Sequence, residues 1–240
     1  MTTTGDIVGD IAARLEEVQE RIDAACERAG RAPSSVTLVA VTKTHPAEVV
    51  RTLLDLGIYD IGENRVDEMV AKMADVTGAR WHFVGRLQSN KARDVVGRAV
   101  VVHSVDRASL ARALSRRAEG EGVPQRVLLQ VNVGDDPGKG GCRPEDALDL
   151  LEGIRELPHL AVEGLMTIPP LPSAREDPAE AARPHFATLR ELRDAARERW
   201  PEVVHLSMGM SADFEAAVGE GATIVRVGTA LLGPRPTGPG

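Results

Sequence analysis

Lys43 is the residue whose type and position most suggest covalent chemistry. It ends an apolar run, residues 36–42, that has the length and β-branched composition of a buried strand. Desolvation at the end of such a strand lowers the pKa of an amine, and a neutral amine can attack a carbonyl group to form a Schiff base. On the residues alone, a lysine that lies along apolar surface with its ammonium in water is the commoner situation.

Three other polar side chains lie at or near the ends of predicted strands. Arg226 alternates with Ile224 and Gly228, so its guanidinium is expected to face the interior and to need an acceptor there. It could form a structural ion pair or donate to a pyridine nitrogen. Asn64 could simply cap a helix. His82 could be a core histidine with its hydrogen bonds satisfied.

The bulk composition excludes several classes of protein. The chain has 240 residues, is 42% hydrophobic and carries a net charge of −7, which argues against a nucleic-acid partner held by a general basic field. No apolar stretch approaches the length of a membrane span, and the N-terminus has no signal-peptide pattern. The two cysteines and the histidines show no disulfide or metal-ligand spacing, so we expect free thiols, a cytoplasmic protein and no metal site.

Strand-like and helix-like runs alternate after a predicted amphipathic helix at residues 6–29. We expect strands at 36–43, 58–61, 81–84, 100–105, 126–133, 161–168, 204–208 and 223–227. Between them we expect helices at 46–56, 63–76, from about 89, 107–120, 144–155, 178–199 and 212–219. Eight strand–helix units favour a (β/α)8 TIM barrel over an open sheet. Barrel and first helix would form a single domain, 1–240, with a flexible tail at 234–240.

In a barrel, the ends of the last two strands lie side by side and commonly bind phosphate. Residues 206–211 (LSMGMS) and 226–229 (RVGT) supply hydroxyl groups, a glycine and helix N-termini at these ends. Ser211 and Thr229 could also be ordinary helix caps. Lys139 lies on the same predicted rim, whereas Lys72 falls in the middle of a helix and is interpreted as a surface residue.

Several further segments occur in the same order as in a known family. They are residues 41–43 (VTK), 62–64 (GEN), 81–91 (WHFVGRLQSNK), 103–106 (HSVD), 164–166 (GLM), 206–211 and 225–229. With them, residues 36–233 resemble the pyridoxal phosphate homeostasis protein family, also called YggS/PROSC-like. The barrel of that family is similar to the N-terminal domain of alanine racemase, the fold type III class.

The resemblance implies that pyridoxal 5′-phosphate (PLP) is the cofactor and that it is covalently attached to Lys43 as a Schiff base. Arg226 would face the pyridine nitrogen, and the loops after the last two strands would hold the phosphate. The expected cofactor-binding residues are Lys43, Asn64, His82, Ser207, Ser211, Arg226, Gly228 and Thr229. The chain departs from the family pattern at Arg65, where relatives often have tyrosine, and at 67–68, where Asp-Glu replaces Gln-Glu.

The resemblance also implies a binding protein that acts in intracellular PLP (vitamin B6) homeostasis without catalysis. An arginine stays protonated, so the ring nitrogen facing it stays unprotonated and the cofactor is a weak electron sink. Racemases of this class use a tyrosine from a second domain or subunit, whereas Tyr59, the single tyrosine here, begins a strand at the opposite end of the barrel.

Two alternatives remain open: a weak PLP-dependent amino-acid racemase and a cofactor-free Schiff-base aldolase. PLP-dependent apoenzymes are the expected recipients of the cofactor, and we expect a monomer.

Overall fold

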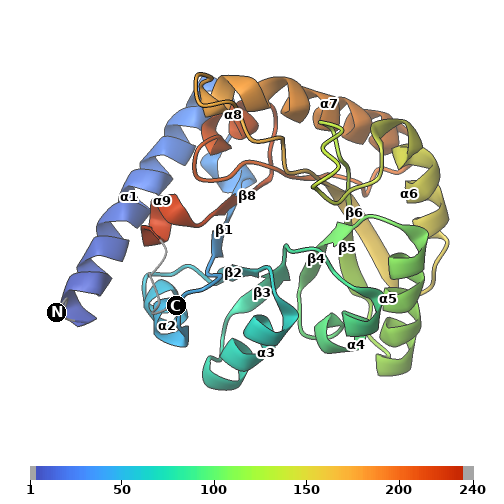
Figure 1. The fold of residues 1–240 in the computed structure, drawn as a ribbon, viewed down its shortest axis with the longest axis horizontal. Helices are drawn as coiled ribbons and strands as arrows, with labels where there is room; N and C mark the ends of the chain where they lie inside the picture. Colours follow the sequence, from blue (N-terminus) through green and yellow to red (C-terminus); the bar gives the residue numbers. More distant parts are fainter. Residues whose placement is uncertain (1–3, 235–240) are drawn as a thin grey trace.

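Within residues 4–234, which the computed structural model describes, eight parallel strands close into a barrel surrounded by helices (Figure 1). Neighbouring strands follow the chain order, and β8 returns to pair with β1. The strands are β1 (Thr37–Val41), β2 (Asp60–Glu63), β3 (Arg80–Phe83), β4 (Val101–Val105), β5 (Gln125–Gln130), β6 (Leu160–Met166), β7 (His205–Ser207) and β8 (Ile224–Val227). The predicted fold class is therefore confirmed.

The helices follow the predicted order, with small differences in their bounds. They are α1 (Thr4–Arg28), α2 (Ala47–Asp55), α3 (Val66–Asp75), α4 (Ala92–Val95), α5 (Ala108–Glu121), α6 (Ala147–Arg155), α7 (Pro178–Arg199), α8 (Phe214–Gly219) and α9 (Thr229–Leu232). The helix expected from residue 89 is a 3-10 turn, Ser89–Lys91, followed by the single turn α4. The predicted tail lies, except for Pro234, outside the described residues.

Each strand differs from its predicted range by one to three residues at an end, and β2 and β5 differ most. β2 begins two residues late, because Ile58, in the turn after α2, still donates its N–H to the carbonyl oxygen of Leu53 in that helix. β5 ends at Gln130, three residues early, and Val131 beyond it forms only an isolated bridge to Cys142. The ends of both strands carry residues that line the barrel mouth.

The barrel interior is only partly aliphatic. A small cluster fills part of it, formed by Val39, Val101, Leu128, Met166 and Ile224. Buried polar side chains occupy much of the rest, and they come from β3, β4, β7 and β8: His82, His103, Ser207 and Arg226. Strand alternation predicts that Arg226 faces inward, but it did not indicate how much of the interior is polar.

Helix α1 packs along the outside of the barrel, against α8 and α9 (Figure 1). Its buried face includes Ile11, Val18, Ile22 and Cys26, which recur at the helical spacing seen in the sequence. Of the helices described, none has the length and apolarity that crossing a membrane requires.

Candidate functional site

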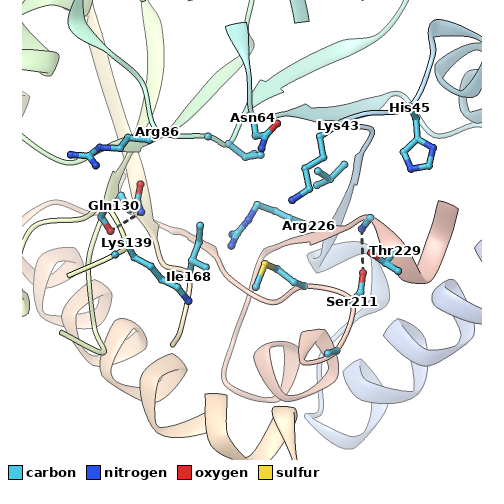
Figure 2. A pocket seen from close by; sticks show the side chains of 18 of the residues that line it. Lys43, His45, Asn64, Arg86, Gln130, Lys139, Ile168, Ser211, Arg226 and Thr229 are labelled. Carbon is cyan, nitrogen blue, oxygen red and sulfur yellow. Dashed lines mark hydrogen bonds between the residues drawn. The ribbon is translucent and has the colours of Figure 1, made fainter. Parts of the chain in front are cut away.

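A cavity of about 500 Å³ opens at the C-terminal end of the barrel, where the strand ends and their following loops meet. Its volume lies within the range of small-molecule sites, about 300–1,000 Å³. Six of the eight residues expected to bind a cofactor line it: Lys43, Asn64, Ser211, Arg226, Gly228 and Thr229. Figure 2 shows the side chains of Lys43 and Arg226 extending into the same space, between Asn64 and Ser211.

Lys43 lies two residues beyond the end of β1, in the turn that leads to α2. It follows the interior residues Val39 and Val41 by strand alternation, and Val41 lines the cavity beside it. The next residue, Thr44, has a φ of 68°, a left-handed conformation that is unusual for a β-branched residue. The turn around Lys43 therefore needs support from its surroundings.

A buried ion cluster supplies that support, and we call Thr42, Glu63, Glu68 and Lys72 the Lys72 cluster. The Lys72 ammonium donates to the carbonyl oxygen of Thr42 at 2.7 Å, to Glu63 Oε1 at 2.6 Å and to Glu68 Oε1 at 2.9 Å. The Thr42 hydroxyl donates to Glu63, and the N–H of Thr44 donates to Glu68. Both neighbours of Lys43 are thus tied to β2 and α3.

The interpretation of Lys72 as a surface residue was wrong. Its side chain is only 7% exposed, and that of Glu63 is fully buried. Burial raises the pKa of Glu63, although the hydrogen bonds from Lys72 and Thr42 act in the opposite direction. The four-residue spacing from Glu68 to Lys72 was the available signal, but helical spacing alone does not show that a pair faces a strand end.

The loops after β7 and β8 are joined through the hydroxyl of Ser211. Its Oγ accepts the backbone N–H groups of Gly228, at 3.3 Å, and of Ala230, at 3.1 Å (Figure 2). A Cβ atom on Gly228 would lie 3.2 Å from the carbonyl oxygen of Val41, so the absence of a side chain lets β8 turn closely against β1. Hydroxyl and backbone N–H groups are the donors that phosphate sites at these loops use.

Asn64 brings an unsatisfied polar atom to the cavity. Its Oδ1 is buried and, in the described part of the chain, accepts no hydrogen bond. A buried acceptor without a partner costs free energy, so a ligand donor or a water at this position would stabilise the site. Gly85 permits this placement, because a Cβ atom there would lie 2.1 Å from the carbonyl oxygen of Asn64.

Two hydrogen bonds fix the Arg226 side chain, one to a side chain and one to the backbone. Its NH1 group donates to Ser207 Oγ at 2.7 Å and its NH2 group to the carbonyl oxygen of Thr167 at 2.8 Å. Burial lowers the pKa of the guanidinium to about 10, while Asp213 raises it. The group therefore remains protonated at neutral pH and acts only as a donor.

The remaining two candidates, Ser207 and His82, do not line the cavity. Ser207 is fully buried below Arg226 and contacts it directly. His82 is the third of the four residues of β3, and it lines a smaller cavity of about 260 Å³ together with Asp60 and His205. It is hydrogen-bonded on both ring nitrogens, as the alternative of a satisfied core histidine predicted.

Among the lining residues that were not assigned to the site from the sequence, the polar or charged side chains are those of His45, Arg86, Gln130 and Lys139. Lys139 donates to the carbonyl oxygen of Pro169, and burial lowers its pKa. Burial and the nearby charge of Lys72 lower the pKa of His45. Lys139 had been placed on the rim by the strand pattern, but nothing in the sequence distinguished it from other rim residues.

The charge of the lining indicates the class of ligand. Lys43, Arg86, Lys139 and Arg226 line the cavity, and among the described residues no aspartate, glutamate, cysteine or tyrosine does so. Tyr59 lies outside it and is 47% exposed. An amine, a guanidinium and a hydroxyl-lined turn in a cationic cavity suit a phosphorylated carbonyl compound. The described residues contain no cluster of three or more potential metal ligands.

Comparison with known proteins identifies a matching domain family and similar full-length relatives. The model of the alanine racemase N-terminal domain matches residues 14–236. The pyridoxal phosphate homeostasis protein of Aquifex aeolicus is 47% identical over 225 residues, covering 92% of this chain and 97% of its own. The pyridoxal phosphate homeostasis protein of Escherichia coli K12 is 40% identical over 233 residues, which cover 95% of this chain and 98% of the relative.

Solved structures give the same result. The structure of PipY from Synechococcus elongatus with PLP bound is 38% identical, has a TM-score of 0.80 and covers 93% of this chain and 100% of its own. An alanine racemase from Clostridium difficile has a TM-score of 0.75 at 16% identity, and this chain covers only 58% of it. At that identity the likeness shows the barrel fold alone.

Proposed function

Because this chain belongs to the pyridoxal phosphate homeostasis protein family, we propose that it binds PLP in the cavity at the barrel mouth. We further propose that PLP is held there as a Schiff base on Lys43, and that the protein acts in vitamin B6 homeostasis without catalysing a reaction. A relative of known structure, PipY, is described with PLP bound.

One observation carries the proposal: a single cavity collects a group for each functional part of PLP. The Lys43 amine suits the aldehyde, Arg226 suits the ring nitrogen, and the Ser211 and Gly228 loops suit the phosphate. The buried acceptor on Asn64 has no partner among the described residues, so a donor from a bound ligand would satisfy it.

We propose the following roles for the lining residues. Bound PLP supplies an electrophilic aldehyde and a ring that can accept electrons. The Lys43 amine would condense with the aldehyde and release one water, and the Lys72 cluster fixes the turn that carries this lysine. Arg226 would hold the ring nitrogen, and Ser211, Gly228 and Thr229 would hold the phosphate.

The side chains favour holding PLP over using it. A guanidinium with a pKa of about 10 does not give up its proton at neutral pH, so the ring nitrogen facing it stays unprotonated and the electron sink is weak. A two-base racemisation needs an acid–base group on each face of the substrate. The racemase tyrosine has no counterpart among the described lining residues, and His45 and Lys139 are the groups that would have to replace it.

The proposal is tested by adding PLP to the purified protein and to two variants, Lys43→Ala and Lys91→Ala. Lys91 serves as the control, because it pairs with Asp67 on the surface and does not line the cavity. We expect one PLP per chain with a yellow absorption band in the wild type and in Lys91→Ala, and no such band in Lys43→Ala. A wild type that stays colourless and unmodified would refute PLP binding and would favour the aldolase.

Catalysis is tested separately with L-alanine as substrate. We expect D-alanine to form no faster than with the same concentration of free PLP. Turnover above that rate, lost in Lys43→Ala, would refute the non-catalytic part of the proposal and support the racemase.

We also propose a cytoplasmic monomer that gives PLP to PLP-dependent apoenzymes. Free thiols at Cys26 and Cys142 support a reducing compartment. Light scattering on the purified protein should give the mass of a single chain, and a dimer mass would contradict this proposal. After free PLP is removed, loading of an apoenzyme from the PLP-treated protein should exceed loading from the Lys43→Ala variant treated in the same way.

A further inference from the structure

A continuous chain of four hydrogen bonds crosses the barrel interior from the cavity to the opposite end. Arg226 NH1 lies 2.7 Å from Ser207 Oγ, and Ser207 Oγ lies 2.8 Å from His103 Nδ1. His103 Nε2 then lies 2.9 Å from His82 Nδ1, and His82 Nε2 lies 3.0 Å from Asp60 Oδ1. The residues come from five strands, and we call Asp60, His82, His103, Ser207 and Arg226 the buried chain.

The carboxylate end sets the direction of every bond in the buried chain when both histidines are neutral. The Asp60 carboxylate can only accept when ionised, so His82 carries its proton on Nε2 and donates it to Asp60. A neutral His82 then accepts at Nδ1 from His103 Nε2, and a neutral His103 accepts at Nδ1 from the Ser207 hydroxyl. Ser207 Oγ also accepts from Arg226, which can only donate.

The charges of the buried chain keep this direction stable. Burial, together with the nearby charge of Arg226, holds the pKa of His103 well below its ordinary value, so this ring stays neutral. Burial raises the pKa of Asp60, but hydrogen bonds from His82 and Arg80 outweigh it and lower the pKa to about 2. A cation at one end and a carboxylate at the other thus enclose the neutral ring of His103.

We propose that Asp60, His82, His103 and Ser207 are positioning residues that orient the Arg226 guanidinium toward the ring nitrogen of the cofactor. The inference rests on the proposed function, since it assigns the buried chain a role in recognising PLP. Because His103 takes the Ser207 proton, the lone pairs of Ser207 remain available to Arg226, and each bond polarises the next. The interior then selects a ligand with a nitrogen acceptor at this ring position.

The first test needs no PLP. Nitrogen-15 NMR of the histidine side chains in the unloaded protein reports the tautomer of each ring. We expect His82 and His103 to be neutral and protonated on Nε2 at pH 7, and Asp60→Asn to give a mixture of tautomers at His82, because an amide can donate as well as accept. A charged His103, or a proton on its Nδ1, would overturn the assigned direction.

The second test measures the affinity for PLP and for 1-deaza-PLP, in which a C–H group replaces the ring nitrogen. Ser207→Ala leaves Arg226 with Thr167 as its remaining anchor, and should weaken PLP binding about tenfold while changing 1-deaza-PLP binding less than twofold. Asp60→Asn should weaken PLP binding about threefold, with the same selectivity. Because Asp60 lies at the partly exposed end of the buried chain, Asp60→Asn provides the same test if Ser207→Ala does not fold.

Glu163→Gln is the matched control. Glu163 pairs with Arg126 and lines the same small cavity as Asp60 and His82, but it does not belong to the buried chain. It should leave both affinities unchanged. Equal loss of PLP and 1-deaza-PLP binding in Ser207→Ala or Asp60→Asn would overturn the positioning role and leave the proposed function intact. A wild type that binds no PLP would overturn the proposed function itself.

Discussion

Lys72→Met should strongly destabilise the protein and loosen the turn that carries Lys43. Methionine has a similar length but cannot donate a hydrogen bond, so three bonds are lost at once, to Thr42, Glu63 and Glu68. Glu63 would keep only the Thr42 hydroxyl as a partner while remaining fully buried. The main cost is therefore the buried carboxylate left without a counter-charge.

Removing one partner of a buried ion pair costs about 3–5 kcal/mol. Whole domains are stable by only about 5–15 kcal/mol, so this loss is a large fraction of the total. For a chain of this size, 1 kcal/mol changes the midpoint of thermal unfolding by about 2–4 °C, which gives an expected decrease of about 10 °C.

Thermal and urea unfolding, followed by circular dichroism, measure the effect on the unloaded protein. Lys91→Met is the matched control, because the Lys91 ammonium also lies 2.7 Å from a carboxylate, that of Asp67, but both side chains reach solvent. Exposed ion pairs contribute little, so the control should unfold close to the wild-type midpoint. Similar midpoints for the two variants would refute the argument that burial makes the Lys72 cluster important.

A double variant separates lost charge balance from lost packing. Lys72→Met combined with Glu63→Gln removes the unpaired carboxylate and should be less destabilised than the sum of the two single variants. If the two effects simply add, the cost comes from packing and the electrostatic explanation is wrong. PLP should also form its covalent bond more slowly in Lys72→Met, because Thr42 and Thr44 lose their anchors.

Three other changes test separate parts of the site. Ser211→Ala removes one hydroxyl and should weaken PLP binding, measured by equilibrium dialysis, by about 1 kcal/mol, roughly fivefold. An unchanged affinity would show that Ser211 only links the two loops. Gly85→Ala forces a Cβ atom against the backbone of Asn64 and should lower the free energy of unfolding by about 3 kcal/mol or more. A urea midpoint equal to that of the wild type would contradict the close approach of these two residues. The pKa of Asp60 is lowered from 3.8 to about 2, so the ionised carboxylate stabilises the folded protein fully above about pH 4, and this stabilisation is lost as the pH falls toward 2. Asp60→Asn should therefore remove about 1–2 kcal/mol from the decrease in stability between these pH values. Identical acid-unfolding curves for the wild type and the variant would contradict this expectation.

The order of elements could be predicted because each strand and helix has its own period of apolar residues. The (β/α)8 arrangement and the family resemblance are both confirmed. Lys43 and Arg226 were found because strand alternation places them at strand ends that face the interior. Ser211, Gly228 and Thr229 were predicted because phosphate sites recur after the last two strands of this fold, and all three line the cavity.

Alternation could not predict depth within the barrel. It shows that His82 and Ser207 face inward, but it does not show that both lie below the cavity, where they bond to His103 and Arg226. Lys72 was misinterpreted for a related reason: its partner Glu63 belongs to another element, and the contact arises only when β2 and α3 pack together. The resemblance supplied residue identities at these positions without their geometry.

The most direct test of the account is borohydride reduction of the PLP-loaded protein, followed by peptide mass mapping. The account predicts one reduced phosphopyridoxyl group per chain, on the peptide that contains Lys43, and none on Lys72, Lys91 or Lys139. A label on Lys139 instead, or PLP bound in the cavity without any label on Lys43, would contradict the central claim.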